Sequence, residues 1–118
     1  MKEIDIEDLV KRIGWRGKHA DKLIVVGETL VIIEETATAK IGDLKQLEET
    51  VNATLHGPLK NYLQLSPRKI IAIVHATKRV DPMVTRPLRH KTKRNIAYRA
   101  ANCQNHLKIV LKQHGITI

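Results

Sequence analysis

Two acidic residues bracket a pair of short apolar runs in the segment DKLIVVGETLVIIEE, residues 21–35. Gly27 and Glu28 separate the runs, and a glycine at the first central position of a two-residue turn is typical of a β-hairpin. In that register Asp21 faces Glu34 across the two strands. Directly opposed side chains have Cβ atoms roughly 4.5–5.5 Å apart, and two like charges at that distance repel each other.

A divalent cation with oxygen ligands, Mg²⁺ or Mn²⁺, would relieve the repulsion between Asp21 and Glu34. The alternative is that both acids end their strands in water, where the repulsion is screened and nothing binds. The pattern favours the two interpretations equally, because a one-residue shift of the turn would remove the opposition. Since side chains alternate along a strand, Thr36 shares the face of Glu34, whereas Lys22 lies on the other face.

The elements around the hairpin follow from apolar periodicity and turn residues. They are a helix over residues 6–13, the hairpin, a helix from residue 42 that breaks at Gly57–Pro58, a strand over 69–76, a basic loop over 77–95 and a helix over about 92–114. Asp43 is expected to cap the second helix together with Gln46. Both faces of the hairpin are mostly apolar, so helices should cover both. We therefore expect one α/β domain over residues 1–118.

The net charge of +9 is distributed unevenly. Residues 1–49 contain eleven acids and eight Lys or Arg, a charge of −3, whereas residues 50–118 contain thirteen Lys or Arg and one acid, Asp81, a charge of +12. A segment this basic predicts a polyanionic partner, because each phosphate contact releases condensed counterions. Nucleic acid is favoured over a membrane, since no helix combines a basic face with a bulky aromatic anchor. The aromatic content of 3% favours duplex or branched DNA over stacked single strands.

The rest of the composition excludes several classes of protein. One cysteine, Cys103, leaves no partner for an internal disulfide and too few thiols for a zinc-thiolate site. The first thirty residues lack the basic start and apolar stretch of a signal peptide. No apolar run approaches the ~20 residues that span a bilayer. We expect a soluble, cytoplasmic protein.

Two adjacent segments resemble the PD-(D/E)XK nuclease superfamily. They are GKHADKLIVVGETLVIIEET, residues 17–36, and the start of the next helix, GDLKQLEE. The RecB-like and archaeal Holliday-junction-resolvase branches are the most similar. The resemblance covers nearly the whole chain in element order, but as a motif only about residues 17–50. It implies a small restriction-endonuclease-like core in the order helix, β-hairpin, helix, strand, helix. It also implies that Asp21 and Glu34 are catalytic metal ligands for Mg²⁺ or Mn²⁺, with the backbone carbonyl of Glu35 as a further ligand.

The chain departs from this family at Thr36, which stands where the family has a lysine. That lysine is thought to orient the attacking water and to steady the charge at the phosphate. Lys40, four residues further on, is the candidate to replace it as the catalytic lysine, and Lys45 is a second possibility. If neither lysine reaches the site, the chain is a catalytically impaired relative.

The expected function is that of a metal-dependent DNA endonuclease or exonuclease, a deoxyribonuclease acting on duplex or branched DNA. One alternative is a non-catalytic nucleic-acid-binding protein on the same scaffold, and another is an interaction module whose basic half docks on an acidic protein. A homodimer is plausible because cutting both strands needs two sites. The residues expected to contact DNA phosphates are Arg68, Lys69, Lys78, Arg79, Arg86, Arg89, Lys91, Lys93, Arg94 and Arg99.

Overall fold

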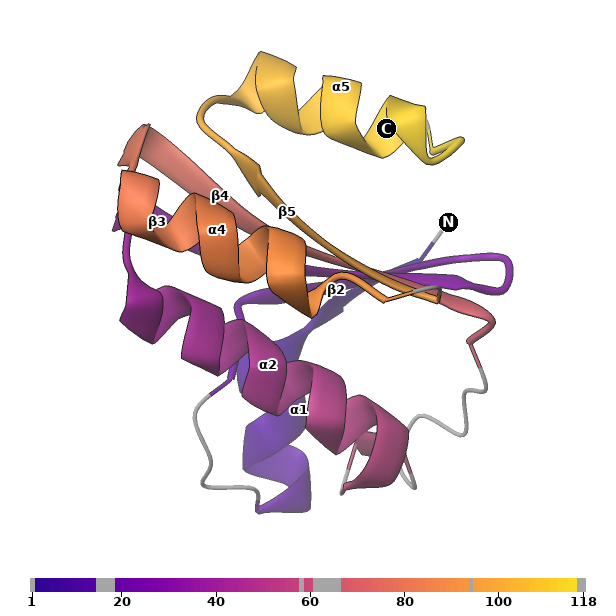
Figure 1. Ribbon diagram of the computed structural model, residues 1–118. Coiled ribbons are helices and arrows are strands. Elements are labelled where there is room, and N and C mark those ends of the chain that lie inside the picture. The colour runs from indigo at the N-terminus through magenta and orange to yellow at the C-terminus, as the bar shows by residue number, and fades with distance from the viewer. Residues whose placement is uncertain (1, 15–18, 58, 61–66, 94, 117–118) are drawn as a thin grey trace.

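A five-stranded mixed sheet forms the centre of the molecule, and the strands follow one another across it in chain order (Figure 1). The computed structural model describes residues 2–14, 19–57, 59–60, 67–93 and 95–116. β1, β2 and β3 pair antiparallel, whereas β4 and β5 extend the sheet parallel to β3. The strands are β1 (Lys2–Asp5), β2 (Lys22–Val26), β3 (Thr29–Ala39), β4 (Lys69–Val80) and β5 (Ile96–Ala101). This architecture confirms the predicted α/β class.

Helices cover both faces of the sheet, as the apolar character of both hairpin faces predicted (Figure 1). α1, α2 and α4 lie on one face, and α5 lies on the other. The helices are α1 (Ile6–Ile13), α2 (Ile41–His56), α4 (Pro82–Lys91) and α5 (Gln104–Gln113). No helix in the described part of the chain is long and apolar enough to cross a membrane.

Two aliphatic clusters, one on each side of the sheet, hold these layers together. On the first side Leu23 and Ile32 of the hairpin pack in a cluster with Leu47 of α2, and none of the three is exposed. On the second side Ile33 of β3 packs in a cluster with Leu111 of α5. Because β3 and β4 are buried on both faces, their sequences are nearly continuous β-branched runs rather than alternating ones.

The β2–β3 hairpin has the predicted register. Val26 pairs with Thr29 and Lys22 pairs with Ile33, so the reversal falls at Gly27 and Glu28. Gly27 has φ = +58°, in the left-handed region that a side chain disfavours. The turn therefore fixes which residues of the two strands share a face.

The helix boundaries agree with the sequence at α1 and differ in detail at α2. Asp5 accepts the Glu7 N–H at 3.0 Å and begins α1, and Gly14 ends it with φ = +71°. At α2 the Asp43 carboxylate accepts the Lys40 N–H at 2.9 Å, so the helix begins earlier than expected. The prediction that Asp43 caps α2 with Gln46 was wrong, because Asp43 is already the third residue of the helix.

The segment predicted as a basic loop contains the end of β4 and the whole of α4. Pro82 occupies the first turn of α4, and Asp81 accepts the Met83 N–H at 3.0 Å. An Asp–Pro pair suits a helix start, because proline needs no N–H there. Val84 and Leu88, four residues apart, bury one side of α4 against the core, and their packing stabilises the helix despite Pro87 inside it.

The helix predicted over residues 92–114 was also wrong in its first half, because residues 96–101 form β5. Ile96 pairs with Ile70 and Ala101 with His75, so β5 completes the sheet along the free edge of β4. α5 begins only at Gln104. The four-residue strand β1, which pairs with β2, was not predicted either.

The outer edge of β5 is partly closed by the chain that leads into it. Thr92 Oγ1 accepts the Tyr98 N–H at 3.1 Å and lies 3.3 Å from the Tyr98 carbonyl oxygen. The Lys93 N–H donates to the Ile96 carbonyl at 2.8 Å. The backbone groups at Ile96 and Tyr98 therefore have partners within the same chain.

Candidate functional site

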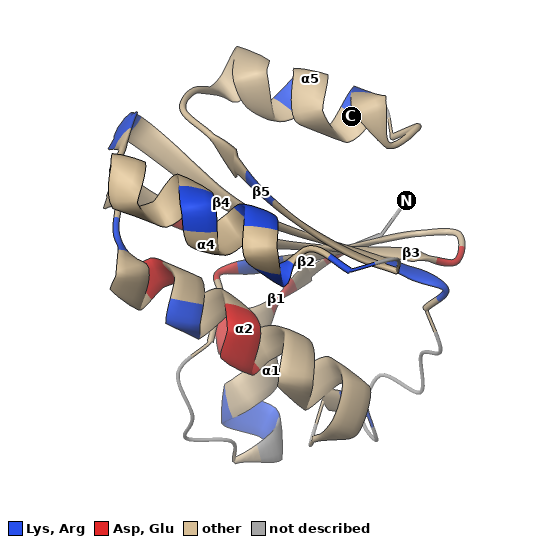
Figure 2. Cartoon of the chain, in the orientation of Figure 1, with Lys and Arg blue, Asp and Glu red and all other residues tan. Residues whose placement is uncertain are grey.

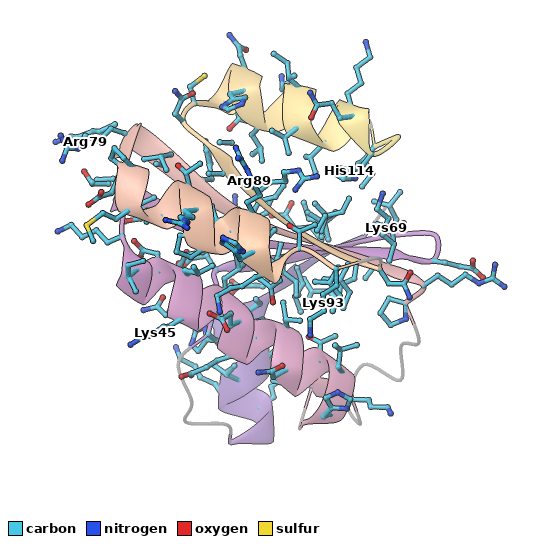
Figure 3. The ribbon with its side chains drawn as sticks, in the orientation of Figure 1. Lys45, Lys69, Arg79, Arg89, Lys93 and His114 are labelled. Carbon is cyan, nitrogen blue, oxygen red and sulfur yellow. The ribbon has the colours of Figure 1, made fainter. Side chains whose placement is uncertain are left out.

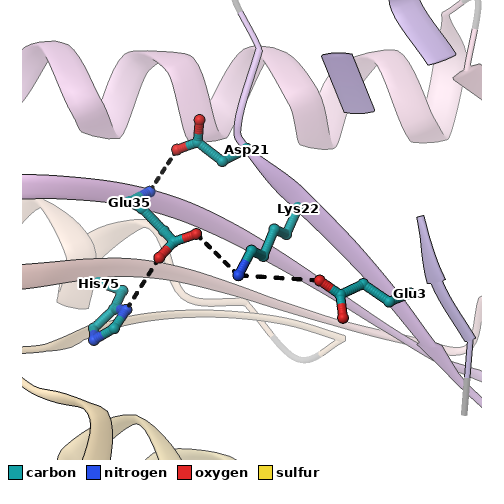
Figure 4. Close-up of polar contacts among 5 residues, drawn as sticks. All are labelled: Glu3, Asp21, Lys22, Glu35 and His75. Atoms are coloured by element: carbon teal, nitrogen blue, oxygen red, sulfur yellow. Dashed lines mark hydrogen bonds and ion pairs between the residues drawn. The ribbon is translucent and has the colours of Figure 1, made fainter. Parts of the chain in front are cut away.

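The hairpin brings Asp21 and Glu34 together at the start of β2. The Asp21 N–H donates to the Ile33 carbonyl at 3.0 Å, although Ile33 already pairs with Lys22, so the regular β2–β3 ladder ends at Lys22. Asp21 Oδ2 accepts the Glu35 N–H at 2.7 Å, so the carboxylate lies against the backbone beside Glu34 (Figure 4). The carboxyl groups of Asp21 and Glu34 are within hydrogen-bonding distance of each other, on the side of β3 opposite to the Glu35 side chain (Figure 4).

Glu34 is buried without full satisfaction of its carboxyl group. The residue is 3% exposed, and Oε2 has no hydrogen-bond partner in the described part of the chain. The pKa of Glu34 is raised from 4.5 to about 9, first by burial, then by the hydrogen bond with the Asp21 carboxylate and its negative charge, and last by the charge of Asp43. In the absence of a compensating charge, Glu34 is therefore protonated at neutral pH.

The pair fits a hard divalent cation. Mg²⁺ typically takes one or two carboxylates from the protein and completes its octahedron with water and substrate phosphate oxygens. Oε2 of Glu34 and the neighbouring carboxylate of Asp21 would be two such ligands. A cluster of three or more acidic, histidine or cysteine ligands is not found among the described residues. The Glu35 side chain lies on the opposite face, so only its backbone carbonyl remains as the predicted third ligand.

α2 holds the residue before Asp21 in place. The Ala20 N–H, which is inaccessible to solvent, donates to Thr50 Oγ1 at 2.7 Å, and the Thr50 hydroxyl donates to the Gln46 carbonyl at 3.0 Å. This contact was missed in the sequence. Its only signal was a pair of threonines, Thr50 and Thr54, within the apolar stripe of the helix.

The structure brings no lysine into contact with the carboxylate pair within the described residues. Thr36 is half-buried, and its hydroxyl donates to the Thr38 carbonyl at 3.3 Å in the irregular part of β3. Lys40 is exposed at the start of α2, and Lys45 is exposed one turn further along that helix. Lys22 lies on the opposite face, as predicted, and forms an ion pair with Glu35 at 3.1 Å.

The opposite face carries a second charged cluster (Figure 4). Glu35 lies between Lys22 and His75, whose Nδ1 is 3.8 Å from Glu35 Oε2, and Lys22 also reaches Glu3 at 4.0 Å. The pKa of Lys22 is raised, chiefly by its hydrogen bond to Glu35. His75 is buried in β4, and its Nε2 has no hydrogen-bond partner in the described part of the chain. This cluster lies beside a cavity of about 180 Å³.

The residues predicted to contact DNA lie in several places. Arg68 precedes β4 and Lys69 begins it, whereas Lys78 and Arg79 lie near its end, so the two pairs are roughly 30 Å apart along the strand. Lys69 and Arg79 accordingly lie at opposite ends of the sheet (Figure 3). Two of the predicted residues are engaged by acids: Arg68 with Glu28 at 3.1 Å and Lys91 with Glu48 at 2.8 Å. Arg86, Arg89 and Lys93 are exposed, Arg99 is half-buried, and Arg94 lies outside the described residues.

Basic and acidic residues both occur where β3 and β4 end and α2 begins (Figure 2), and four of the cations there are exposed, while the acids there are Asp43 and Asp81. Arg79 pairs with Thr38 across the two strands, and Lys40 follows β3 directly. We call Lys40, Lys45, Lys78 and Arg79 the basic edge. Glu34 is the middle residue of β3, so the end of β3 at the basic edge lies roughly 16 Å further along the strand.

Comparison with protein-family models found no match, and comparisons with curated proteins and with solved structures found none either. The fold and the geometry of the carboxylate pair are therefore the basis for a functional argument.

Proposed function

We propose that this protein is a metal-dependent nuclease that hydrolyses phosphodiester bonds of duplex or branched DNA. The observation that carries the proposal is the Asp21–Glu34 pair, in which a buried carboxyl oxygen has no partner in the described part of the chain. A group left in this state is costly unless a ligand compensates it. The proposal includes membership of the PD-(D/E)XK nuclease superfamily, with which the mixed sheet is compatible.

In this proposal each residue near the pair has a defined task. Asp21 and Glu34 hold Mg²⁺ or Mn²⁺, which when bound supplies a water of lowered pKa and polarises a phosphate oxygen. The Glu35 N–H fixes the orientation of the Asp21 carboxylate through the 2.7 Å hydrogen bond. Lys40 and the rest of the basic edge hold the DNA backbone and neutralise charge that develops at the phosphate. A homodimer would supply a second site for the opposite strand.

The test is a cleavage assay with labelled duplex and four-way-junction DNA in Mg²⁺ or Mn²⁺. We expect the wild-type protein to cut, and Glu34→Gln to lose at least 100-fold in rate while it still binds DNA. Glu49→Gln is the matched control, because Glu49 is an exposed acid on α2. Cleavage by Glu34→Gln at the wild-type rate would remove the pair from the mechanism.

The second candidate is a non-catalytic nucleic-acid-binding protein on the same scaffold. The observation that favours it is Thr36 at the lysine position, together with the lack of any lysine in contact with the pair among the described residues. The same assay separates the two functions. DNA binding without cleavage in either metal would favour this candidate.

A further inference from the structure

A cavity of about 460 Å³ lies among α4, β5 and α5, built from elements other than those that carry Asp21 and Glu34. This volume is in the range of pockets that hold small organic ligands and exceeds what a single inorganic ion fills. In Figure 3 the region lies between α4 and α5, where Arg89 is labelled.

Two arginines from different elements line this cavity, Arg89 of α4 and Arg99 of β5. Arg99 Nη1 donates to the Tyr98 carbonyl at 3.0 Å and lies 3.4 Å from Thr92 Oγ1, so these contacts fix the guanidinium from one side. A guanidinium has five N–H donors, and these contacts occupy one nitrogen. No carboxylate in the described part of the chain is within ion-pair distance of either arginine.

Neutral polar groups surround the arginines. Asn102, His106 and Thr85 line the same cavity. His106 Nδ1 lies 3.1 Å from both the backbone nitrogen and Oδ1 of Asn102, so these two residues are held together at one end of the cavity. No acidic residue lines the cavity, and Asp81 is the only acid of the chain after Glu49. The cavity is therefore a concentration of hydrogen-bond donors and positive charge, which suits an anion with several acceptor oxygens.

The remaining wall is apolar. Val80, Leu88, Tyr98 and Ala100 complete the lining, and Leu88 and Tyr98 are largely buried. An inorganic phosphate would leave this wall uncovered. A nucleotide would match both the arginines and the apolar wall. Its phosphate can accept hydrogen bonds from arginines, and its base can cover apolar and aromatic surface.

We propose that this cavity binds a nucleotide through its phosphate monoester, with Arg89 and Arg99 on the phosphate and the base against the apolar wall, where Val80 and Ala100 are half-buried. The nucleotide is either a free nucleoside monophosphate or the phosphorylated end of a nucleic-acid strand, since both present the same chemical groups. The site is separate from the carboxylate pair and needs no metal, so it stands whether or not the protein is a nuclease.

The test is calorimetric titration of the full chain, in a chelator, with each of the four 2′-deoxynucleoside 5′-monophosphates and with the matching nucleosides. We expect at least one monophosphate to bind ten-fold more tightly than its nucleoside. Arg89→Ala should weaken that binding at least ten-fold, whereas Lys108→Ala, which removes an exposed cation of α5 outside the cavity, should change it less than two-fold. Glu34→Gln should bind as the wild type does. Thermal unfolding of Arg89→Ala verifies that this exposed substitution leaves the fold intact.

Two further titrations distinguish the sources of the nucleotide. A short oligonucleotide with a 5′-phosphate is compared with the same oligonucleotide with a 5′-hydroxyl. If the 5′-phosphate raises the affinity for the oligonucleotide ten-fold or more, and Arg89→Ala loses this increase, the ligand is a strand end. If the increase is smaller than ten-fold while the free monophosphate binds tightly, the ligand is the free nucleotide. The proposal is overturned if no monophosphate exceeds its nucleoside, if Arg89→Ala binds normally, or if Lys108→Ala loses as much.

Discussion

Glu34 carries a carboxyl group at a position where ionisation is unfavourable unless another charge compensates it. The side chain is buried, one oxygen is unpartnered in the described part of the chain, and Asp21 adds a second negative charge beside it. Such a group either keeps a proton or binds a cation. The two states differ in proton content, and this difference can be measured in two independent ways.

The first measurement is of stability without metal. Because the pKa of Glu34 is about 9 in the folded protein and near 4.5 when unfolded, the unfolded chain releases this proton first as pH rises. The free energy of unfolding should therefore fall between about pH 4.5 and pH 9 because of this group. Glu34→Gln removes the dependence, so we expect the variant to gain roughly 1–3 kcal/mol relative to the wild type between pH 5 and pH 8. Urea unfolding in a chelator at both pH values measures the gain, and an equal difference at the two pH values would contradict it.

The second measurement is of metal binding. A cation that binds both carboxylates must displace the proton of Glu34, so the Mn²⁺ affinity of the wild type should rise about ten-fold per pH unit between pH 6 and pH 8. Titrations in two buffers of different ionisation enthalpy should show the release of about one proton. Glu34→Gln should bind Mn²⁺ weakly at every pH. Binding without proton release would place the metal elsewhere.

At the scale of elements, the site depends on one helix and one hairpin that meet at Ala20. The hairpin sets the register of Asp21 and Glu34, and α2 holds the backbone before Asp21 through Thr50. The hydrogen bond is buried and joins residues thirty positions apart, so its loss leaves an unsatisfied N–H next to the site.

We therefore expect Thr50→Val to lower the free energy of unfolding by roughly 1–3 kcal/mol and to weaken Mn²⁺ binding. Thr54→Val is the matched control, because the Thr54 hydroxyl is also buried but donates only to the Thr50 carbonyl within the same helix. Urea unfolding and metal titration of both variants provide the comparison. Equal metal affinity in the two variants would show that the contact has no role in positioning Asp21.

Local signals in the sequence predicted the hairpin and α1, because a turn or a cap is set by residues close together in the chain. β5 was not predictable in this way. Ile96 and Ala100 have the spacing of a helix. This segment forms a strand because it pairs with the free edge of β4, more than twenty residues earlier in the chain. Thr50 was missed for the same reason, because its donor at Ala20 is distant in sequence.

At the scale of the whole molecule, the acidic and basic halves of the sequence do not form separate acidic and basic sides of the structure. Some of the basic residues are paired with acids of the first half, as Lys91 is with Glu48 and Arg68 is with Glu28. The exposed cations that remain include the basic edge at the ends of β3 and β4 and Arg89 at the cavity. The amount of positive charge was evident from the sequence, but its placement depends on the fold.

If the basic edge holds DNA, its contribution should appear in the salt dependence of binding. Arg79→Ala should weaken binding to duplex DNA and reduce the slope of log affinity against log salt by about 1. Lys112→Ala, which removes an exposed cation from α5, should leave the slope unchanged. Filter binding at several salt concentrations measures both slopes, and equal slopes for the two variants would exclude Arg79 as a phosphate contact.

The partners that Thr92 and Lys93 provide to Tyr98 and Ile96 have a consequence for self-association. A strand at the margin of a sheet can recruit a strand from another copy, which leads to fibres or swapped assemblies. Here the first half of that margin is already occupied by its own chain, and the opposite margin, β1, is only four residues long. The free part of each margin is therefore short among the described residues, which disfavours open-ended growth by strand pairing.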